Sequence, residues 1–124
     1  MAPLNCHCSL CRKQHGAAFR SRVCVQATDF RWLKGEHLVK FYESSRGYPR
    51  GFCGECGSPI LNRNGPNWKP PAEFPNPSPQ YGVALALLDD PPARPAAHCF
   101  VASKAPWFEI TDDLRQYPDY PPPG

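Results

Sequence analysis

Two tight clusters of cysteines constrain this chain more than any other feature of its sequence. Five of the seven cysteines fall at positions 6, 8 and 11 and at positions 53 and 56, and the other two stand alone. The count is odd, and the first residues show no basic region followed by an apolar run, so we expect neither a signal peptide nor a fully paired disulfide framework. Clustered cysteines in such a chain indicate metal binding or catalysis, and we expect a cytoplasmic protein.

The second cluster has the spacing of a zinc knuckle. Cys53 and Cys56 are separated by two residues, which lets both thiolates reach one tetrahedral zinc ion. Gly54 and Gly57 flank Cys56 and permit the tight backbone turn that such ligands need. A pair of core cysteines is the alternative interpretation, but it gives no reason for the glycines. The spacing therefore predicts zinc at Cys53 and Cys56.

The first cluster is a less common arrangement. Cys6, Cys8 and Cys11 can occupy three corners of a tetrahedron from one short loop. His7 lies between two of them and is expected to point away from an ion that they share. No fourth protein ligand is obvious nearby, and zinc with three protein ligands and one open position is typical of catalysis. The sequence therefore predicts a catalytic zinc at these three cysteines.

The spacing also permits a single structural site. In that interpretation Cys8 and Cys11 join Cys53 and Cys56 around one zinc ion, as in a zinc ribbon. Cys6 is then unused, and residues 12–52 separate the two pairs, which is more than a compact ribbon usually has. Spacing alone leaves both interpretations open.

Short strands separated by turns are predicted for most of the chain. In residues 19–27 apolar side chains alternate with Arg20, Arg22 and Gln26, which is typical of a half-buried strand. Residues 64–80 hold six prolines and are predicted to form a long surface loop. Further strands are expected at residues 37–42, 81–88 and 97–102, with residues 50–52 leading into the second cysteine cluster and 58–61 leading out of it. Single helical turns are expected at 29–32 and from 111–113 onward. The predicted fold is mostly β with minor helix.

Length and charge narrow the classes of partner. A chain of 124 residues is expected to form one domain. Its longest apolar stretch, residues 83–88, is too short to span a bilayer, so no membrane is expected. The net charge of +3 is small, and its densest cluster is Arg12 and Lys13. Such a cluster suits an anionic small molecule better than a nucleic acid, which favours a longer basic stripe.

Three groups of residues, in order along the chain, carry a resemblance to a known family. The first group is Asn5, Cys6, His7, Cys8, Ser9, Leu10, Cys11, Arg12, Lys13, Gly16, Ala17 and Phe19. The second is Gly35, Tyr42, Glu43, Ser44 and Ser45, with residues 52–58. The third is Leu88, Asp89, Asp90, Pro95, His98, Phe100, Val101, Lys104, Trp107 and residues 110–114. Together they resemble the glutathione-dependent formaldehyde-activating family, which includes centromere protein V.

The resemblance implies a fold and two metal sites. The fold is the β-tent (Mss4-like), in which short antiparallel sheets are pinned by zinc; it implies a zinc-binding domain at residues 1–117 and a proline-rich tail at 118–124. A catalytic zinc is implied at the cysteines matched by Cys6, Cys8 and Cys11. A structural zinc is implied at four cysteines, two of which match Cys53 and Cys56.

The other two structural cysteines of the family belong to a Cys-x-Cys strand upstream of the catalytic segment. This sequence begins about where that segment does, so we expect either an N-terminally incomplete form or a shortened member with a weakened structural site. Cys24 lies on the polar side of its predicted strand and is a poor candidate for a third ligand. Cys99 is expected to be a buried structural thiol.

The implied reaction is addition of the glutathione thiol to formaldehyde or a related small aldehyde, or the reverse carbon–sulfur lyase reaction. Zinc bound by three thiolates has a net charge of −1 and can hold an incoming thiol as thiolate. Arg12 and Lys13 are expected to hold a glutathione carboxylate, and Trp107 is either a pocket wall or a core aromatic. The alternative function is a non-catalytic zinc-binding interaction module with one structural zinc.

Overall fold

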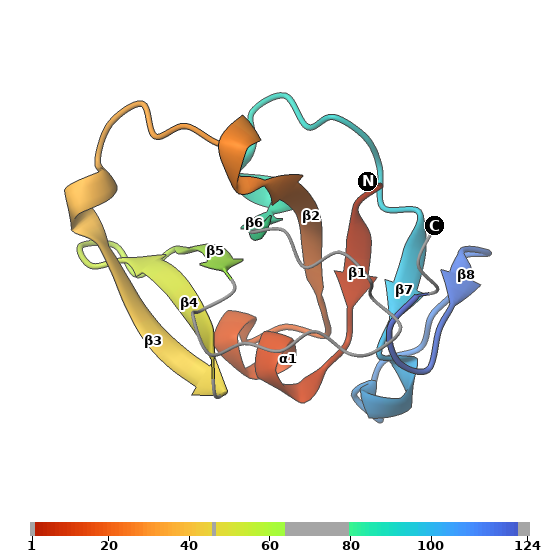
Figure 1. Ribbon diagram of the computed structural model, residues 1–124. Coiled ribbons are helices and arrows are strands. Elements are labelled where there is room, and N and C mark those ends of the chain that lie inside the picture. The colour runs from red at the N-terminus through yellow and green to blue at the C-terminus, as the bar shows by residue number, and fades with distance from the viewer. Residues whose placement is uncertain (1, 46, 64–79, 122–124) are drawn as a thin grey trace. The chain divides into compact units, whose positions relative to one another are not determined.

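The computed structural model describes residues 2–45, 47–63 and 80–121. Within these ranges the chain forms eight β-strands, one α-helix and four short 3₁₀ helices (Figure 1). The expected fold, mostly β with minor helix, is confirmed. The chain divides into two compact units: residues 1–23 with 84–124, and residues 24–83. No helix within the described ranges is long and apolar enough to cross a membrane.

The first unit is built on strands in the order β2–β1–β7–β8. β1 (Leu4–Cys6) pairs antiparallel with β2 (Arg20–Gln26), which continues past Val23 into the residues of the second unit. On its other side β1 pairs parallel with β7 (Ala97–Cys99), and β8 (Arg115–Gln116) extends β7, also in parallel. The expected antiparallel pairing therefore holds for β1 with β2, but the two pairs that involve β7 are parallel.

The helix α1 (Ser9–His15) connects β1 to β2. Cys8 has an extended backbone and caps this helix, because its Sγ accepts a hydrogen bond from the Cys11 amide. The helix ends at Gly16, whose φ of 58° is left-handed and favours glycine. The expected loop around the three cysteines is therefore wrong. The chain forms a helix there because a thiol, like a hydroxyl, can accept from an unpaired amide of the first turn.

Sulfur atoms make up much of the core of the first unit. One cluster of that core consists of the buried residues Cys6, Cys11 and Cys99, and the partly buried residues packed against them are Leu4, Cys8 and Phe100. Cys6 lies opposite Cys99 in the β1–β7 register and opposite Arg20 in the β1–β2 register. Arg20 is itself buried, although the alternation in the sequence placed it on the polar side of its strand, because it faces this interior position.

The second unit contains four antiparallel strands in the order β3–β4–β5–β6. Two 3₁₀ turns, Ala27–Asp29 and Glu36–Leu38, precede the first of them. The strands are β3 (Val39–Ser45), β4 (Tyr48–Cys53), β5 (Pro59–Arg63) and β6 (Gln80–Ala84). β3 includes most of the residues of the strand predicted at 37–42, and that prediction is confirmed. β4 leads into the second cysteine cluster and β5 leads out of it.

Two predicted strands end earlier than the sequence pattern indicates. β6 stops at Ala84, and Leu85–Leu87 forms a 3₁₀ turn although the run is apolar. β7 stops at Cys99 because Phe100 has a φ of 57°, a left-handed conformation that ends a strand. A 3₁₀ turn at Val101–Ser103 follows. Short apolar runs of this kind do not distinguish a strand from a helical turn.

The helical turns predicted at 29–32 and after 111–113 do not form there. The nearest 3₁₀ turn, Ala27–Asp29, ends where the first was predicted to begin. Asp112 caps no helix: its carboxylate accepts from the Leu114 amide at 3.0 Å and contacts His98, and β8 follows. An aspartate side chain stabilises an irregular turn as readily as a helix start. The predicted loop at 64–80 lies outside the described residues, except Gln80, which begins β6.

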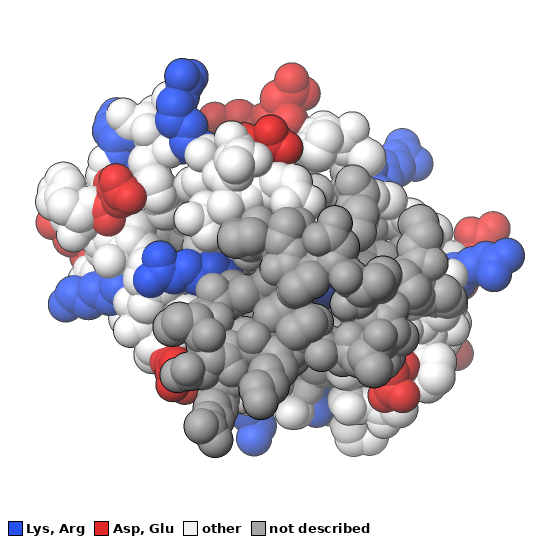
Figure 2. All heavy atoms as spheres, viewed as in Figure 1, with Lys and Arg blue, Asp and Glu red and all other residues white. Residues whose placement is uncertain are grey.

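The beginning of the proline-rich tail is bound to the first unit. The amides of Phe100, Val101 and Ala102 donate to the carbonyls of Asp119, Tyr117 and Pro118, respectively. The Phe100 and Tyr120 rings are 4.7 Å apart in an edge-to-face contact. On the face shown in Figure 2, basic and acidic side chains of the described residues are interspersed rather than gathered by sign.

Candidate metal centre

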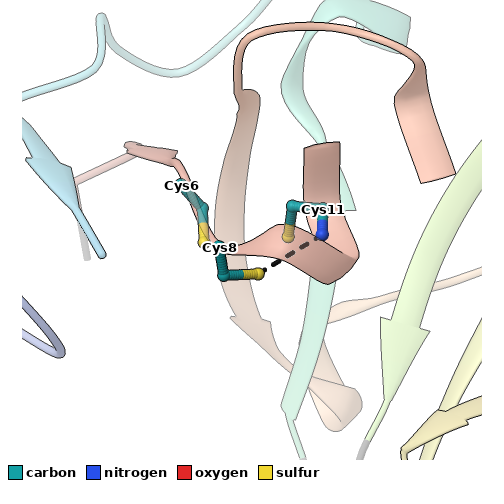
Figure 3. A group of neighbouring side chains, drawn as sticks. All are labelled: Cys6, Cys8 and Cys11. Atoms are coloured by element: carbon teal, nitrogen blue, oxygen red, sulfur yellow. Dashed lines mark hydrogen bonds between the residues drawn. The ribbon is translucent and has the colours of Figure 1, made fainter. Parts of the chain in front are cut away.

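Three sulfur atoms converge where β1 ends and α1 begins. The Sγ atoms of Cys6, Cys8 and Cys11 all lie within 4.8 Å of one another (Figure 3). Cys6 is the last residue of β1, Cys8 caps α1, and Cys11 lies in its first turn. Among the described residues this is the one group of three or more metal-ligating side chains with such spacing. We call these residues the three-cysteine group.

Local hydrogen bonds hold the three-cysteine group in place. The Cys11 amide donates to Cys8 Sγ at 3.3 Å, which ties two of the sulfurs to the same helical turn. The amide of His7 donates to the Cys99 carbonyl at 2.9 Å, and its carbonyl accepts from Arg12 Nε at 3.3 Å. The residue between Cys6 and Cys8 is thus fixed to β7 on one side and to α1 on the other.

The environment of the group keeps the Cys6 and Cys8 thiols protonated in the absence of a cation. Contact with Cys11 raises the pKa of the Cys8 thiol well above its ordinary value, and Cys6 and burial raise it further. Contact with Cys11 is also the main cause of the raised pKa of Cys6. Cys6 and Cys11 are buried, whereas Cys8 is partly exposed. Binding of a soft cation must therefore displace protons, and Cys8 is the sulfur nearest solvent.

Cys99 lies beside the three-cysteine group but outside it. It is fully buried, as the sequence predicts, and packs against Cys6 and Cys11. A hydrogen bond with the Cys6 thiol lowers the pKa of Cys99, and a further contribution comes from Arg22. Its sulfur does not meet the mutual spacing of the other three. Cys99 thus packs against the three-cysteine group from the buried side without belonging to it.

The ring of His7 does not join the group of sulfurs. It is fully buried, and its Nε2 lies 2.8 Å from Nδ1 of His98. His98 is buried too, and its Nε2 lies 3.0 Å from the Asp112 carboxylate. Burial, followed by the charges of His98, Lys104 and Arg12, lowers the pKa of His7 to about 4. The ring is therefore neutral near pH 7.

The second cysteine cluster forms a tight turn between β4 and β5. Cys53 donates its amide to the Ser58 carbonyl at 2.9 Å, and its carbonyl accepts from the Gly57 amide at 2.8 Å. Gly57 has a φ of 79°, which favours glycine. Cys56 is exposed, and hydrogen bonding with Ser58 lowers the pKa of its thiol. The turn has the shape that the knuckle spacing predicts.

Within its own unit this turn offers two sulfurs and no more. No third cysteine, histidine or carboxylate among that unit's described residues lies within 4.8 Å of both Cys53 and Cys56, and Cys24 is therefore not their partner. Two thiolates do not close a structural zinc site. The second cluster is thus a half-site in this unit.

Comparison with known proteins identifies the family. The sequence profile of the family described as glutathione-dependent formaldehyde-activating enzyme matches residues 1–103. The chain belongs to this family. The match includes both cysteine clusters and His98 but ends before Asp112. None of the curated proteins matches the chain.

One solved structure shows the fold. The crystal structure of a Rhodobacter sphaeroides protein superposes with a TM-score of 0.52 at 24% sequence identity, over 70% of this chain and 68% of that one. At this level of identity the likeness concerns the fold alone. The sequence profile thus shows the family, and the superposition shows the fold.

The three-cysteine group fits the zinc ion that membership of the formaldehyde-activating family implies. Three sulfurs bound tetrahedrally to zinc at about 2.3 Å lie roughly 3.8 Å from one another. The sulfur atoms of Cys6, Cys8 and Cys11 lie within 4.8 Å of one another, so the group is compact enough to hold the ion. Thiolates are soft ligands that select zinc over hard cations such as magnesium. Cys6, Cys8 and Cys11 would hold the ion, and the partly exposed side of Cys8 is where a fourth ligand would enter.

The residues expected to bind substrate lie beside the group in different settings. Arg12 is half-buried and donates to the His7 carbonyl, whereas Lys13 is exposed on α1. Trp107 is 74% exposed, so its interpretation as a core aromatic is wrong. The sequence missed the contact of His7 with His98 and Asp112, because these residues are 91 and 105 positions away from His7. The one available signal was a histidine, His98, inside an otherwise apolar strand.

Proposed function

We propose that this protein is a zinc-dependent carbon–sulfur lyase that joins the glutathione thiol to formaldehyde or a related small aldehyde, and catalyses the reverse reaction. The observation that carries the proposal is the three-cysteine group with one partly exposed sulfur and no fourth protein ligand among the described residues. An interaction module has no need of a site that is open on one side. A cytoplasmic location, where glutathione is abundant, belongs to the same proposal.

The reaction needs mainly positioning. A carbon–sulfur bond forms as the carbonyl π bond breaks, and the thiol proton passes to the carbonyl oxygen, so no oxidant or reductant is required. When bound, zinc would supply one thing, a thiol kept in its nucleophilic thiolate form near pH 7. Lys13 is exposed and could contact a glutathione carboxylate directly. Arg12 Nε donates a hydrogen bond to the His7 carbonyl, so Arg12 would bind the same carboxylate only through its remaining N–H groups.

Exchange between free and glutathione-bound formaldehyde, followed by NMR with ¹³C-formaldehyde, tests the proposal. The protein should speed this exchange, and Cys8→Ser should return the rate to that without protein. Cys24→Ser is the matched control, because Cys24 lies outside both clusters, and it should keep the wild-type rate. Lys13→Ala should raise KM for glutathione more than for a thiol without carboxylates.

Two results would contradict the proposal. Exchange no faster than in buffer, with zinc bound, would favour the non-catalytic interaction module. A rate unaffected by Cys8→Ser would show that the chemistry does not take place at the three-cysteine group.

A further inference from the structure

Three side chains from distant parts of the chain form a hydrogen-bonded row that ends next to the three-cysteine group. Asp112 Oδ2 lies 3.0 Å from His98 Nε2, and His98 Nδ1 lies 2.8 Å from His7 Nε2. All three residues belong to the first unit. The two rings are buried, at 0% and 1% exposure for His7 and His98, whereas the Asp112 side chain is 45% exposed. The row thus runs from solvent into the core.

The protons in this row follow from what each atom can donate. An ionised carboxylate only accepts, so His98 must carry its proton on Nε2. A neutral imidazole carries one proton, which leaves His98 Nδ1 bare and makes it an acceptor. His7 must then donate through Nε2, and its own Nδ1 is bare. Burial of the His7 ring favours its neutral form over imidazolium.

The far end of the row agrees with that assignment. His7 Nδ1 is buried and has no hydrogen-bond partner in the described protein. The His7 ring packs between aromatic side chains, with Phe19 and Phe108 at centroid distances of 5.0 and 6.0 Å. A bare acceptor is tolerated in such surroundings better than an N–H group without an acceptor, which is rare in native proteins. The opposite proton arrangement would place such an N–H there.

We propose that Asp112 and His98 are positioning residues of the three-cysteine group, which act by holding His7 in the form protonated on Nε2. His7 stands between two of the sulfurs, and its backbone is bonded to Cys99 and Arg12. If each proton of the row moved to the other nitrogen of its ring, His7 Nδ1 would become a buried N–H without an acceptor. The His7 ring could find an acceptor only by moving the segment that carries Cys6 and Cys8. Partners of this kind that orient a metal site typically change metal affinity about 10- to 100-fold when lost.

The matched pair Asp112→Asn and Asp113→Asn tests the proposal. Asp112 Oδ1 accepts from the Leu114 amide at 3.0 Å, so an asparagine must keep its oxygen there and turn its NH₂ group toward His98 Nε2. Both rings should then change tautomer, so that His98 and His7 each carry the proton on Nδ1 instead of Nε2. Asp112→Ala, which admits water as donor or acceptor, should give a mixture of the two forms. Asp113 is exposed and outside the row, and its variant should match wild type.

Long-range ¹H–¹⁵N NMR spectra of the imidazole rings read these forms directly and do not depend on enzyme activity. The wild type should show both rings protonated on Nε2. Zinc affinity, measured by chelator competition, should fall about tenfold in Asp112→Asn and be unchanged in Asp113→Asn.

The proposal is overturned if wild-type His7 is protonated on Nδ1, or if neither Asp112 variant changes the two rings. It is also overturned if the rings change while zinc affinity does not. The proposal builds on the proposed function, since it concerns the same site, but both readouts stand if the protein proves inactive with formaldehyde.

Discussion

Cys8 combines two roles in one side chain. Its sulfur accepts the Cys11 amide and so starts α1, and it is also the most exposed member of the three-cysteine group. The two roles are compatible, because a thiolate that binds a metal still accepts hydrogen bonds, and more strongly than a thiol. Serine is a favoured helix cap but a poor zinc ligand. Cys8→Ser therefore removes the metal chemistry while it preserves the start of the helix.

His7 gives the protein a predictable response to acid. Its pKa in the folded state is about 4, against an ordinary value of 6.5. Between these two pH values the unfolded chain is protonated at His7 and the folded chain is not. The stabilisation is complete above pH 6.5 and is lost as the pH falls toward 4, with a total on the order of 3 kcal/mol. Urea unfolding of the zinc-free protein at a series of pH values should show this fall.

A titration of the His7 ring by NMR provides the direct check, and its midpoint should lie near pH 4. A midpoint near 6.5 would mean that the ring is not buried as described.

The helix α1 is short, and its two ends decide whether it forms. A helix of seven residues is marginal without caps, and here a thiol caps its start and Gly16 its end. The last turn carries Arg12 and Lys13, whose charges favour the negative end of the helix dipole. The position of Cys11 relative to Cys6 thus depends on residues at both ends of a single element.

Replacement of Gly16 isolates the backbone contribution to this element. A Cβ at this position would meet nothing within 4 Å, so the cost of Gly16→Ala arises from the left-handed conformation alone. We expect a loss of about 1 kcal/mol in the free energy of unfolding, and a smaller loss for Gly16→Asn, which tolerates this conformation. Equal stability of the alanine variant and wild type in urea would contradict the left-handed cap.

Strands with clear alternation or clear turn residues could be predicted from the sequence, and those with neither could not. The strands β2 and β3 fall close to their predicted positions because side-chain alternation marks the first and turns at glycine bound the second. Phe100 could not be foreseen as the end of β7, since a left-handed phenylalanine is set by its surroundings and not by its type. The helix at Cys8 was missed because cysteine is an uncommon cap.

For the molecule as a whole, the composition of the site was predictable but its support was not. The spacing of the first cluster was enough to propose that its three sulfurs share an ion, and the structure brings them together. The row through His98 and Asp112 could not be predicted, because only the folded chain brings His7, β7 and the segment before β8 into contact. The spacing of residues in the sequence predicts contacts within one turn of the chain. Hydrogen bonds between side chains on different strands depend on how the strands are arranged in the fold.

The two clusters should differ in how tightly they hold metal. The first supplies three thiolates, while the second supplies two within its own unit, and affinity for zinc rises steeply with the number of thiolates. In a stepwise chelator titration, zinc lost at low chelator should disappear in Cys56→Ser, and zinc retained longest should disappear in Cys8→Ser. A single cooperative loss of metal and fold in either variant would favour one zinc shared by Cys8, Cys11, Cys53 and Cys56.

The cysteine-lined core of the first unit also limits how its sequence can drift over evolutionary time. Cys6 and Cys11 fill interior space and also provide sulfur atoms of the metal centre. A substitution at either position must therefore preserve both the side-chain volume and the ability to bind metal. A valine at either position would satisfy the packing and erase the centre. Cys99 shares that interior but stands outside the group of three, so an aliphatic residue of similar size would meet the one demand made on it.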